Sequence, residues 1–187
     1  MITGAYAHGL DQSPANHVPL TPLGFLDRAA LVHPERVAII HGELQRTWAQ
    51  TRDRCYQLAS ALVGRGIHPG DTVSILSPNT PAMVEAHLGI PLSGAILNTI
   101  NHRLDAEGIA FILRHSECKL LLVDCEYMAV ASAAIERLEC RPAVINIRDH
   151  LAAVCADSQV LDYESLLAEG DATFEGVWPS TEWQPIA

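Results

Sequence analysis

The sequence predicts an α/β protein with a mainly parallel, doubly wound sheet flanked by helices. Short runs of apolar, β-branched residues alternate along the chain with stretches whose apolar residues recur at helical spacing. Each helix must bury its apolar stripe against a sheet face, which favours right-handed crossovers between parallel strands. The 187 residues, 49% apolar and 18% charged, suffice for one globular unit with its own core.

The first ordered elements are a helix and a hairpin. A lead-in over residues 1–20 contains Gly, Pro, Asn and Ser without apolar periodicity, so we expect it to pack loosely. Thr21-Pro22 then begins a surface helix, with threonine as the cap and proline at the first position. Residues 36–42 form a β-branched run that ends in glycine, and residues 44–46 can return beside it as a second strand.

The most regular helix begins at a capping box, Thr47-Trp48-Ala49-Gln50, and ends before the turn Pro69-Gly70-Asp71. Residues 72–76 follow as a buried strand. Thr80-Pro81 starts another helix, which Pro91 should end or kink.

The same alternation continues through the second half of the chain. The predicted strands cover residues 95–100, 119–123 and 143–147, and the predicted helices are one capped by Asp105, one from Tyr127 to Leu138 and a short one from Tyr163 to Ala168. From His150 onward the pattern is less regular. We therefore divide the chain into a flexible lead-in (1–20), an α/β subdomain (21–149) and a less regular segment (150–187).

Charge and cysteine content narrow the classes of partner and compartment. A net charge of −10 disfavours nucleic acid and anionic lipid surfaces as partners, because both bind through Lys and Arg. The five cysteines are odd in number and spread over apolar or amphipathic runs, which predicts free thiols in a reducing cytoplasm. No segment approaches the roughly 18 apolar residues of a membrane span, so we expect a soluble protein.

Common phosphate-binding and hydrolase motifs are missing. Gly64, Gly66 and Gly70 imitate a dinucleotide fingerprint, but they follow a helix and precede a strand, which is the reverse of the required order. They are interpreted as a helix stop and a turn. No Gly-x-Ser-x-Gly occurs, so the sequence lacks the turn that holds the nucleophile of an α/β serine hydrolase.

The nearest metal-like cluster is His115, Cys118 and Cys125. No paired second set completes tetrahedral spacing, so packed cysteines and a surface histidine are the favoured interpretation, and no metal site is predicted. The carboxylates offer only helix caps, and no catalytic residue is predicted.

Arg103 is the candidate binding residue. It lies in Asn98-Thr99-Ile100-Asn101-His102-Arg103-Leu104, between a predicted strand and the helix capped by Asp105. In open α/β sheets ligands bind at that edge. A solvated loop arginine is the alternative interpretation.

The order of these segments, over about Thr21 to Asp149, resembles the amino-terminal region of the AMP-forming acyl-CoA synthetases, which belong to the adenylate-forming superfamily. The matching segments are Pro34 to Ile39, Thr47-Trp48, Leu62 to Ile67, Gly70 to Val73, Ser77 to Pro81, Gly94 to Asn101 and Arg103-Leu104. The run from Ala95 to Leu104, followed by Phe111 to Ser116, is most similar to the branch acting on fatty, aryl or methylthio-substituted short acids.

The resemblance implies a two-step reaction in which ATP activates a carboxylic acid as an acyl-adenylate and the CoA thiol then displaces AMP, with Mg²⁺ accompanying the nucleotide. It also implies a Gly-, Ser- and Thr-rich loop that ends in lysine and holds phosphates. Residues 182–187 resemble the stretch that precedes this loop. We therefore expect an amino-terminal fragment that by itself neither adenylates an acid nor binds ATP tightly.

The resemblance also gives Arg103 a role, because Asn101-His102-Arg103-Leu104 matches the family's Asn-x-Arg-Leu segment, whose arginine contacts the nucleotide phosphate of CoA. The implied partners are a carboxylic acid and either a second copy of the chain or a complementing carboxy-terminal half. Three alternatives stay open: half of a split synthetase, a non-catalytic interaction domain, and a nicotinamide-dependent oxidoreductase, which lacks its glycine fingerprint.

Overall fold

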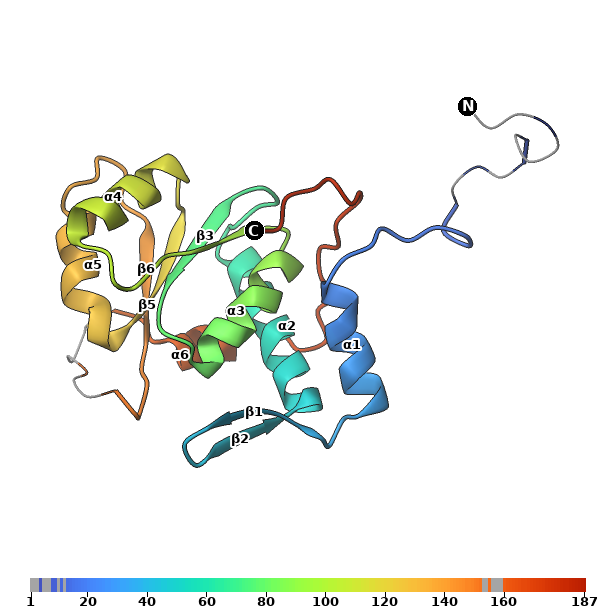
Figure 1. Cartoon of the computed structure of the whole chain (residues 1–187), viewed down its shortest axis with the longest axis horizontal. Coiled ribbons are helices and arrows are strands. Elements are labelled where there is room, and N and C mark those ends of the chain that lie inside the picture. Colours follow the sequence, from blue (N-terminus) through green and yellow to red (C-terminus); the bar gives the residue numbers. More distant parts are fainter. Residues whose placement is uncertain (1–3, 5–7, 10, 12, 153–154, 156–159) are drawn as a thin grey trace.

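The computed structural model describes residues 4, 8–9, 11, 13–152, 155 and 160–187. Four parallel strands form a central sheet with helices on both faces, and a separate antiparallel hairpin lies beyond them (Figure 1). The α/β prediction is therefore confirmed. In chain order the elements are α1 (Leu23–Val32), β1 (Val37–His41), β2 (Leu44–Thr47), α2 (Trp48–Gly64), β3 (Thr72–Leu76), α3 (Pro81–Leu92), β4 (Ile96–Thr99), α4 (Ala106–His115), β5 (Leu120–Asp124), the 3-10 turn η2 (Cys125–Tyr127), α5 (Met128–Ile135), β6 (Ala143–Ile147) and α6 (Tyr163–Ala168).

The sheet has the strand order β4-β3-β5-β6, and all three pairings are parallel. The chain leaves β3 for β4 on one side and then crosses to β5 on the other, so the strand order reverses beside β3. Every residue of β5 is buried because helices cover both of its faces. The carboxyl ends of all four strands meet at one edge, which is where ligands bind in open α/β sheets.

Two helical layers enclose the sheet, one on each face. In Figure 1, α4 and α5 lie on one side of the strands, and α2 and α3 lie on the other. Leu120 and Leu122 of β5 pack with the core of α2, α3 and α6. Leu121 and Val123 pack with that of α4 and α5, because successive side chains of a strand point to opposite faces.

The predicted hairpin and its neighbouring helix are also present. β1 and β2 pair antiparallel, and a capping box follows in which the Gln50 N–H donates to Thr47 Oγ1 at 3.3 Å and the Thr47 N–H donates to Gln50 Oε1 at 2.9 Å. Helix α1 packs on α2 through Leu23 and Leu26. Its other face, which includes Phe25, is exposed, as expected for a surface helix.

The glycine prediction is confirmed. Gly66 and Gly70 have φ angles of 82° and 89° in the turns between α2 and β3, a conformation that glycine adopts without a steric penalty. Glu117 adopts a similar angle, 50°, after α4. There the Cys118 N–H donates to the Leu113 carbonyl and the Glu117 N–H to the Arg114 carbonyl, which closes the helix in a Schellman motif.

Two predicted helices differ from the structure at their ends. The helix predicted from Tyr127 to Leu138 is a short 3-10 turn followed by α5, because the buried Asp124 caps the turn by accepting the Glu126 N–H at 3.1 Å. Pro91 lies inside α3, one residue before the helix ends at Leu92. Proline has no N–H to donate to the carbonyl four residues before it, so the helix loses one bond and ends one residue later.

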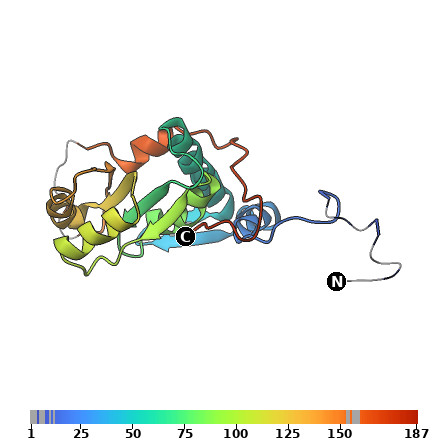
Figure 2. The same cartoon turned by 90° about the horizontal axis from the view of Figure 1, so that it is seen from above.

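The segment after residue 160 is joined to the core. The Asn146 N–H of β6 donates to the Leu161 carbonyl at 2.9 Å, and α6 then buries Leu166 and Leu167 against the α2 layer. Figure 2, the view from above, shows this segment beside the sheet. The predicted flexible lead-in, residues 1–20, falls partly outside the described residues.

Candidate functional site at the carboxyl edge of the sheet

Arg103 lies in the loop between β4 and α4, at the carboxyl edge of the sheet. The Arg103 backbone N–H donates to Asn101 Oδ1 at 3.0 Å, and Asp105 caps α4 by accepting the Gly108 N–H at 2.9 Å. These two bonds fix the loop on either side of the arginine. The predicted position of Arg103 is therefore confirmed, while its role stays a prediction.

The Arg103 side chain is exposed, and its guanidinium forms no hydrogen bond or salt bridge with any other described residue. Tyr127 is near enough to sense its charge: burial raises the pKa of the Tyr127 hydroxyl, and Arg103 opposes that rise. An exposed guanidinium with free N–H groups can bind a phosphate through two parallel hydrogen bonds.

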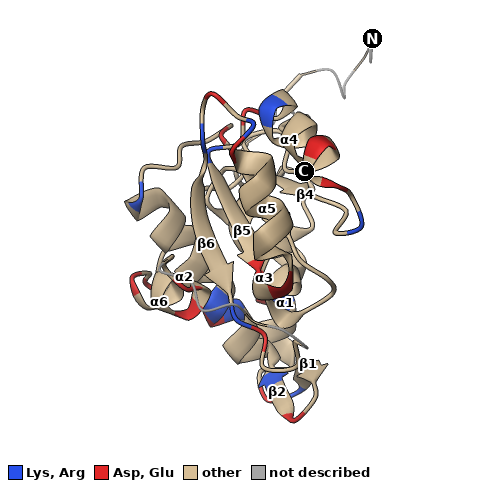
Figure 3. Cartoon of the chain, turned by 90° about the vertical axis from the view of Figure 1, so that its left-hand side faces the viewer, with Lys and Arg blue, Asp and Glu red and all other residues tan. Residues whose placement is uncertain are grey.

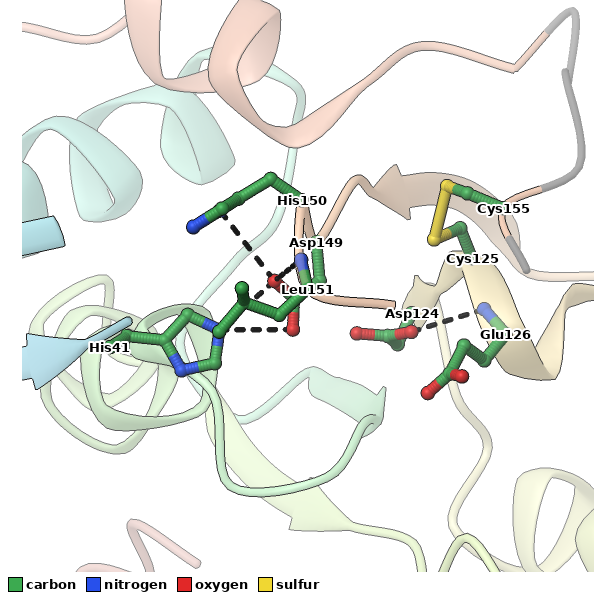
Figure 4. Close-up of a disulfide and its surroundings, with 8 residues drawn as sticks. All are labelled: His41, Asp124, Cys125, Glu126, Asp149, His150, Leu151 and Cys155. Atoms are coloured by element: carbon green, nitrogen blue, oxygen red, sulfur yellow. Dashed lines mark hydrogen bonds and ion pairs between the residues drawn. A yellow bond between two sulfur atoms is a disulfide. The ribbon is translucent and has the colours of Figure 1, made fainter. Parts of the chain in front are cut away.

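A second polar group lies at the other end of the same edge, after β6. His41 Nε2, at the end of β1, is 2.9 Å from Asp149 Oδ1 and 3.0 Å from Oδ2 (Figure 4). The Leu151 N–H also donates to Asp149 at 2.9 Å. Burial alone would raise the pKa of Asp149, but these two partners lower it below its usual value.

A cavity of about 230 Å³ opens beside this pair. His41 and Arg46 of the hairpin, Asp149 after β6 and Tyr163 of α6 line it, together with the first residues of α3. Arg103 is not among its lining residues, because β4 and β6 are the two outer strands of the sheet. The edge thus carries two separate polar regions.

Asp124 lies between them, at the end of β5. Its side chain has no exposed surface, Oδ1 accepts the Glu126 N–H, and Oδ2 has no hydrogen-bond partner among the residues that the structure describes. Figure 4 shows the carboxyl group turned toward Asp149. Burial raises the pKa of Asp124, and the charge of Asp149 adds to that rise. The carboxyl group of Asp124 therefore holds its proton to a higher pH than an exposed aspartate does.

Sequence reasoning missed the buried carboxylate of Glu85, in α3. Arg46 Nη1 and Arg54 Nε donate to Glu85 Oε1 at 2.5 and 2.7 Å, and the Tyr163 hydroxyl donates to Oε2 at 2.9 Å. Burial raises the pKa of Tyr163 well above its usual value. The signal in the sequence is a glutamate in a mostly apolar helix, which does not identify its partners. This cluster joins the hairpin, α2, α3 and α6 beneath the cavity.

The cysteine prediction was wrong for one pair. Cys125 and Cys155 form a disulfide across a sequence separation of 30 residues (Figure 4). Cys125 is placed by the end of β5 and Cys155 follows β6, so the pairing depends on adjacent strand ends that sequence spacing does not reveal. Cys55, Cys118 and Cys140 are free thiols.

The cluster of His115, Cys118 and Cys125 is not brought together. Cys118 precedes β5 and Cys125 follows it, so they lie at opposite ends of a buried strand. Within the described part of the chain, no three His, Cys, Asp or Glu residues are arranged to hold a metal ion. The helices of that part are also too short or too polar to cross a membrane.

Comparison with known proteins shows which family the chain belongs to. The chain is 46% identical to the peroxisomal acetate/butyrate–CoA ligase of Arabidopsis thaliana over 95% of its length, and 39% identical to an acetate–CoA ligase of Humulus lupulus over 100%. It spans about one third of each relative, 33% and 35%. The crystal structure of an anthranilate CoA ligase in complex with anthranoyl-AMP shares the fold, with a TM-score of 0.77 and 21% identity over 87% of this chain and 30% of that one.

The match to the family described as AMP-binding enzyme extends over residues 26–185, from α1 past every strand of the sheet. Because it covers most of the chain and agrees with the relatives in both sequence and fold, this protein belongs to the AMP-binding enzyme family.

Proposed function

We propose that this chain is the amino-terminal part of an acid–thiol ligase that converts ATP, a carboxylic acid and CoA into acyl-CoA, AMP and pyrophosphate. The observation that carries the proposal is the 46% identity with an acetate/butyrate–CoA ligase over nearly the whole chain. The proposed substrates are fatty, aryl or methylthio-substituted short acids. The cytoplasmic location expected from the sequence stays a prediction, and the relative's printed name supports a peroxisomal alternative.

In the complete enzyme, ATP with Mg²⁺ would supply the AMP group that activates the acid, and CoA would supply the thiol that accepts the acyl group. Among the residues of this chain, Arg103 is the proposed contact to a CoA phosphate. Its support is positional: the loop is fixed by Asn101 and Asp105, the guanidinium is exposed, and the described residues leave its N–H groups free. A guanidinium fork matches phosphate better than an ammonium group does.

We further propose that the 187 residues alone do not catalyse the reaction. Holding the phosphates in this chemistry requires a Gly-, Ser- and Thr-rich loop ending in lysine. The single lysine of this chain, Lys119, immediately precedes β5 and follows no such loop. ATP, CoA and Mg²⁺ are therefore proposed for the complete enzyme, which either a longer chain or a complementing carboxy-terminal half would provide.

Measurement of pyrophosphate release tests both proposals, that the chain alone is inactive and that the complete enzyme is a ligase. The 187-residue chain, mixed with ATP, Mg²⁺, CoA and acetate, butyrate or benzoate, should release none above background. A chimera that carries this chain in place of the matching third of the Arabidopsis ligase should be active with at least one of these acids. Turnover by the chain alone would contradict the inactivity proposal, and an inactive but folded chimera would contradict the ligase proposal.

The same chimera tests Arg103. Arg103→Ala should raise the KM for CoA roughly tenfold to a hundredfold, because a hydrogen-bonded charge is lost, while the KM for the acid stays unchanged. Arg103→Lys should restore only part of the affinity. Arg28→Ala removes an exposed arginine on α1 and is the matched control. An Arg103→Ala chimera with unaltered CoA kinetics would remove the role.

A further inference from the structure

A hollow of about 620 Å³ lies at the amino-terminal edge of the sheet, opposite Arg103. It is formed where α4 turns into β5 and where α5 leads to β6. Four of the chain's 12 basic residues line it, together with two carboxylates: Arg114, Lys119, Arg137, Arg141, Glu117 and Glu139. In Figure 3, basic segments lie around the end of the sheet from which β5 and β6 start, near α4.

These charges do not neutralise one another. Among the described residues, none of the four cations forms a salt bridge with a carboxylate, although two glutamates share the hollow. Arginines elsewhere in the chain behave differently: Arg54 Nη2 is 2.6 Å from Glu164 Oε1, and Arg65 Nη2 is 2.7 Å from Glu169 Oε1. Arg114 lies over the Phe111 ring, 6.0 Å from its centroid, and Arg137 donates to the Ala133 carbonyl. Lys119 and Arg141 are therefore the cations of the hollow that are most available to a ligand.

Helix capping does not account for these cations either. Basic residues often follow helices because they offset the partial negative charge of the last carbonyls. Here backbone groups already serve those carbonyls, since the Cys118 N–H donates to the Leu113 carbonyl and the Leu138 N–H to the Ile135 carbonyl, both at 3.0 Å. Among the described basic residues of the hollow, only Arg137 donates to a carbonyl of the preceding helix, that of Ala133 in α5. The other three basic side chains are not used in this way.

The positive charge of the hollow favours an anion as its ligand. Four positive and two negative side chains give it a net positive charge, in a chain whose overall charge is −10. Guanidinium groups bind phosphate through paired hydrogen bonds, and Lys119 adds a compact charge. The buried side chains of Leu113 and Leu138 supply an apolar floor. The volume lies in the range of about 300–1,000 Å³ found for small-molecule sites.

We propose that this hollow binds a multivalent phosphate anion, either a free polyphosphate or the phosphate of a nucleotide. The proposal is independent of the proposed ligase function, because Arg103 and the cavity beside Asp149 lie at the opposite edge of the sheet.

Calorimetric titration of the 187-residue chain with inorganic pyrophosphate, at low ionic strength, tests the site. The double variant Lys119→Gln/Arg141→Gln should bind pyrophosphate at least roughly tenfold more weakly, because two charged hydrogen-bond donors are lost. The control Arg28→Gln/Arg36→Gln removes the same charge from exposed positions outside the hollow and should change the affinity little. Circular dichroism checks that each variant is folded.

A parallel titration with AMP distinguishes the two sources of phosphate. Binding of both ligands identifies a nucleotide site, and binding of pyrophosphate alone identifies a polyphosphate site; either result supports the proposal. It is overturned if pyrophosphate shows no saturable binding, or if the control double variant weakens binding as much as Lys119→Gln/Arg141→Gln does. It is equally overturned if Arg103→Ala produces that loss, because the anion would then bind at the other edge.

Discussion

Glu85 is a charged residue that is fully buried because other side chains bond to its carboxylate. Its side chain has no exposed surface, yet it accepts hydrogen bonds from two arginines that are only 15% and 17% exposed. Desolvating these charges is costly, and their mutual attraction offsets the cost only while all partners remain. The cluster therefore makes the packing of the hairpin, α2 and α6 onto α3 dependent on a single carboxylate.

Glu85→Gln should lower the free energy of unfolding by about 3–5 kcal/mol, because Arg46 and Arg54 would keep their charges in a buried site without compensation. Urea denaturation measures the loss. Glu164→Gln is the matched control: Glu164 bonds to the same Arg54 but is 64% exposed, so its loss should cost less than about 1 kcal/mol. Equal losses in the two variants would show that burial of Glu85 does not set its contribution.

At the scale of elements, the hairpin is fixed to the sheet by the pairing of His41 with Asp149. β1 and β2 form a sheet of their own and share no backbone ladder with β3, so side chains must hold them in place. His41 and Asp149 make the contact at one end of the hairpin, and Arg46 with Glu85 makes it near the other. The cavity between the hairpin and β6 depends on both contacts.

The Asp149 contact should make stability depend on pH on the acid side. The pKa of Asp149 is lowered in the folded protein, so its contribution is fully present above the usual value of 3.8 and is lost as pH falls through the lowered value. At neutral pH, Asp149→Asn should cost about 1–2 kcal/mol in urea denaturation. This difference from the unsubstituted chain should disappear in acid. A difference that stays constant from neutral to strongly acidic pH would refute the assignment.

For the whole molecule, the disulfide changes how the chain is held together. Cys125–Cys155 closes a loop that contains α5 and β6, so it restrains an outer strand and the helix that covers it. The other cysteines are packed or exposed thiols, as the sequence indicates. One covalent link therefore coexists with a core that is otherwise held by aliphatic packing.

Peptide mapping under non-reducing conditions should recover Cys125 linked to Cys155. Cys125→Ser should lower the free energy of unfolding by about 3–4 kcal/mol, the value expected for releasing a loop of this length. Cys140→Ser, at an exposed free thiol, is the control and should have little effect. Recovery of both cysteines as alkylated thiols from unreduced protein would contradict the pairing.

Much of the fold follows from local chemistry, and the sequence alone therefore determined it. The Thr47 capping box, the Asp105 cap, the turns at Gly66 and Gly70 and the four strands of the central sheet depend on residues near one another in the chain. The position of Arg103 at the carboxyl edge follows from the same local order, because a parallel strand ends just before it.

Only the tertiary structure decided which distant residues meet. The partners of Glu85, the pairing of Cys125 with Cys155 and the cluster of unpaired cations around Lys119 join segments that are separated by α5, β6 or the whole of α2. Ion pairs and disulfides form only when their groups lie within a few ångströms of one another. The order of the strands sets these separations, and no local sequence pattern encodes them.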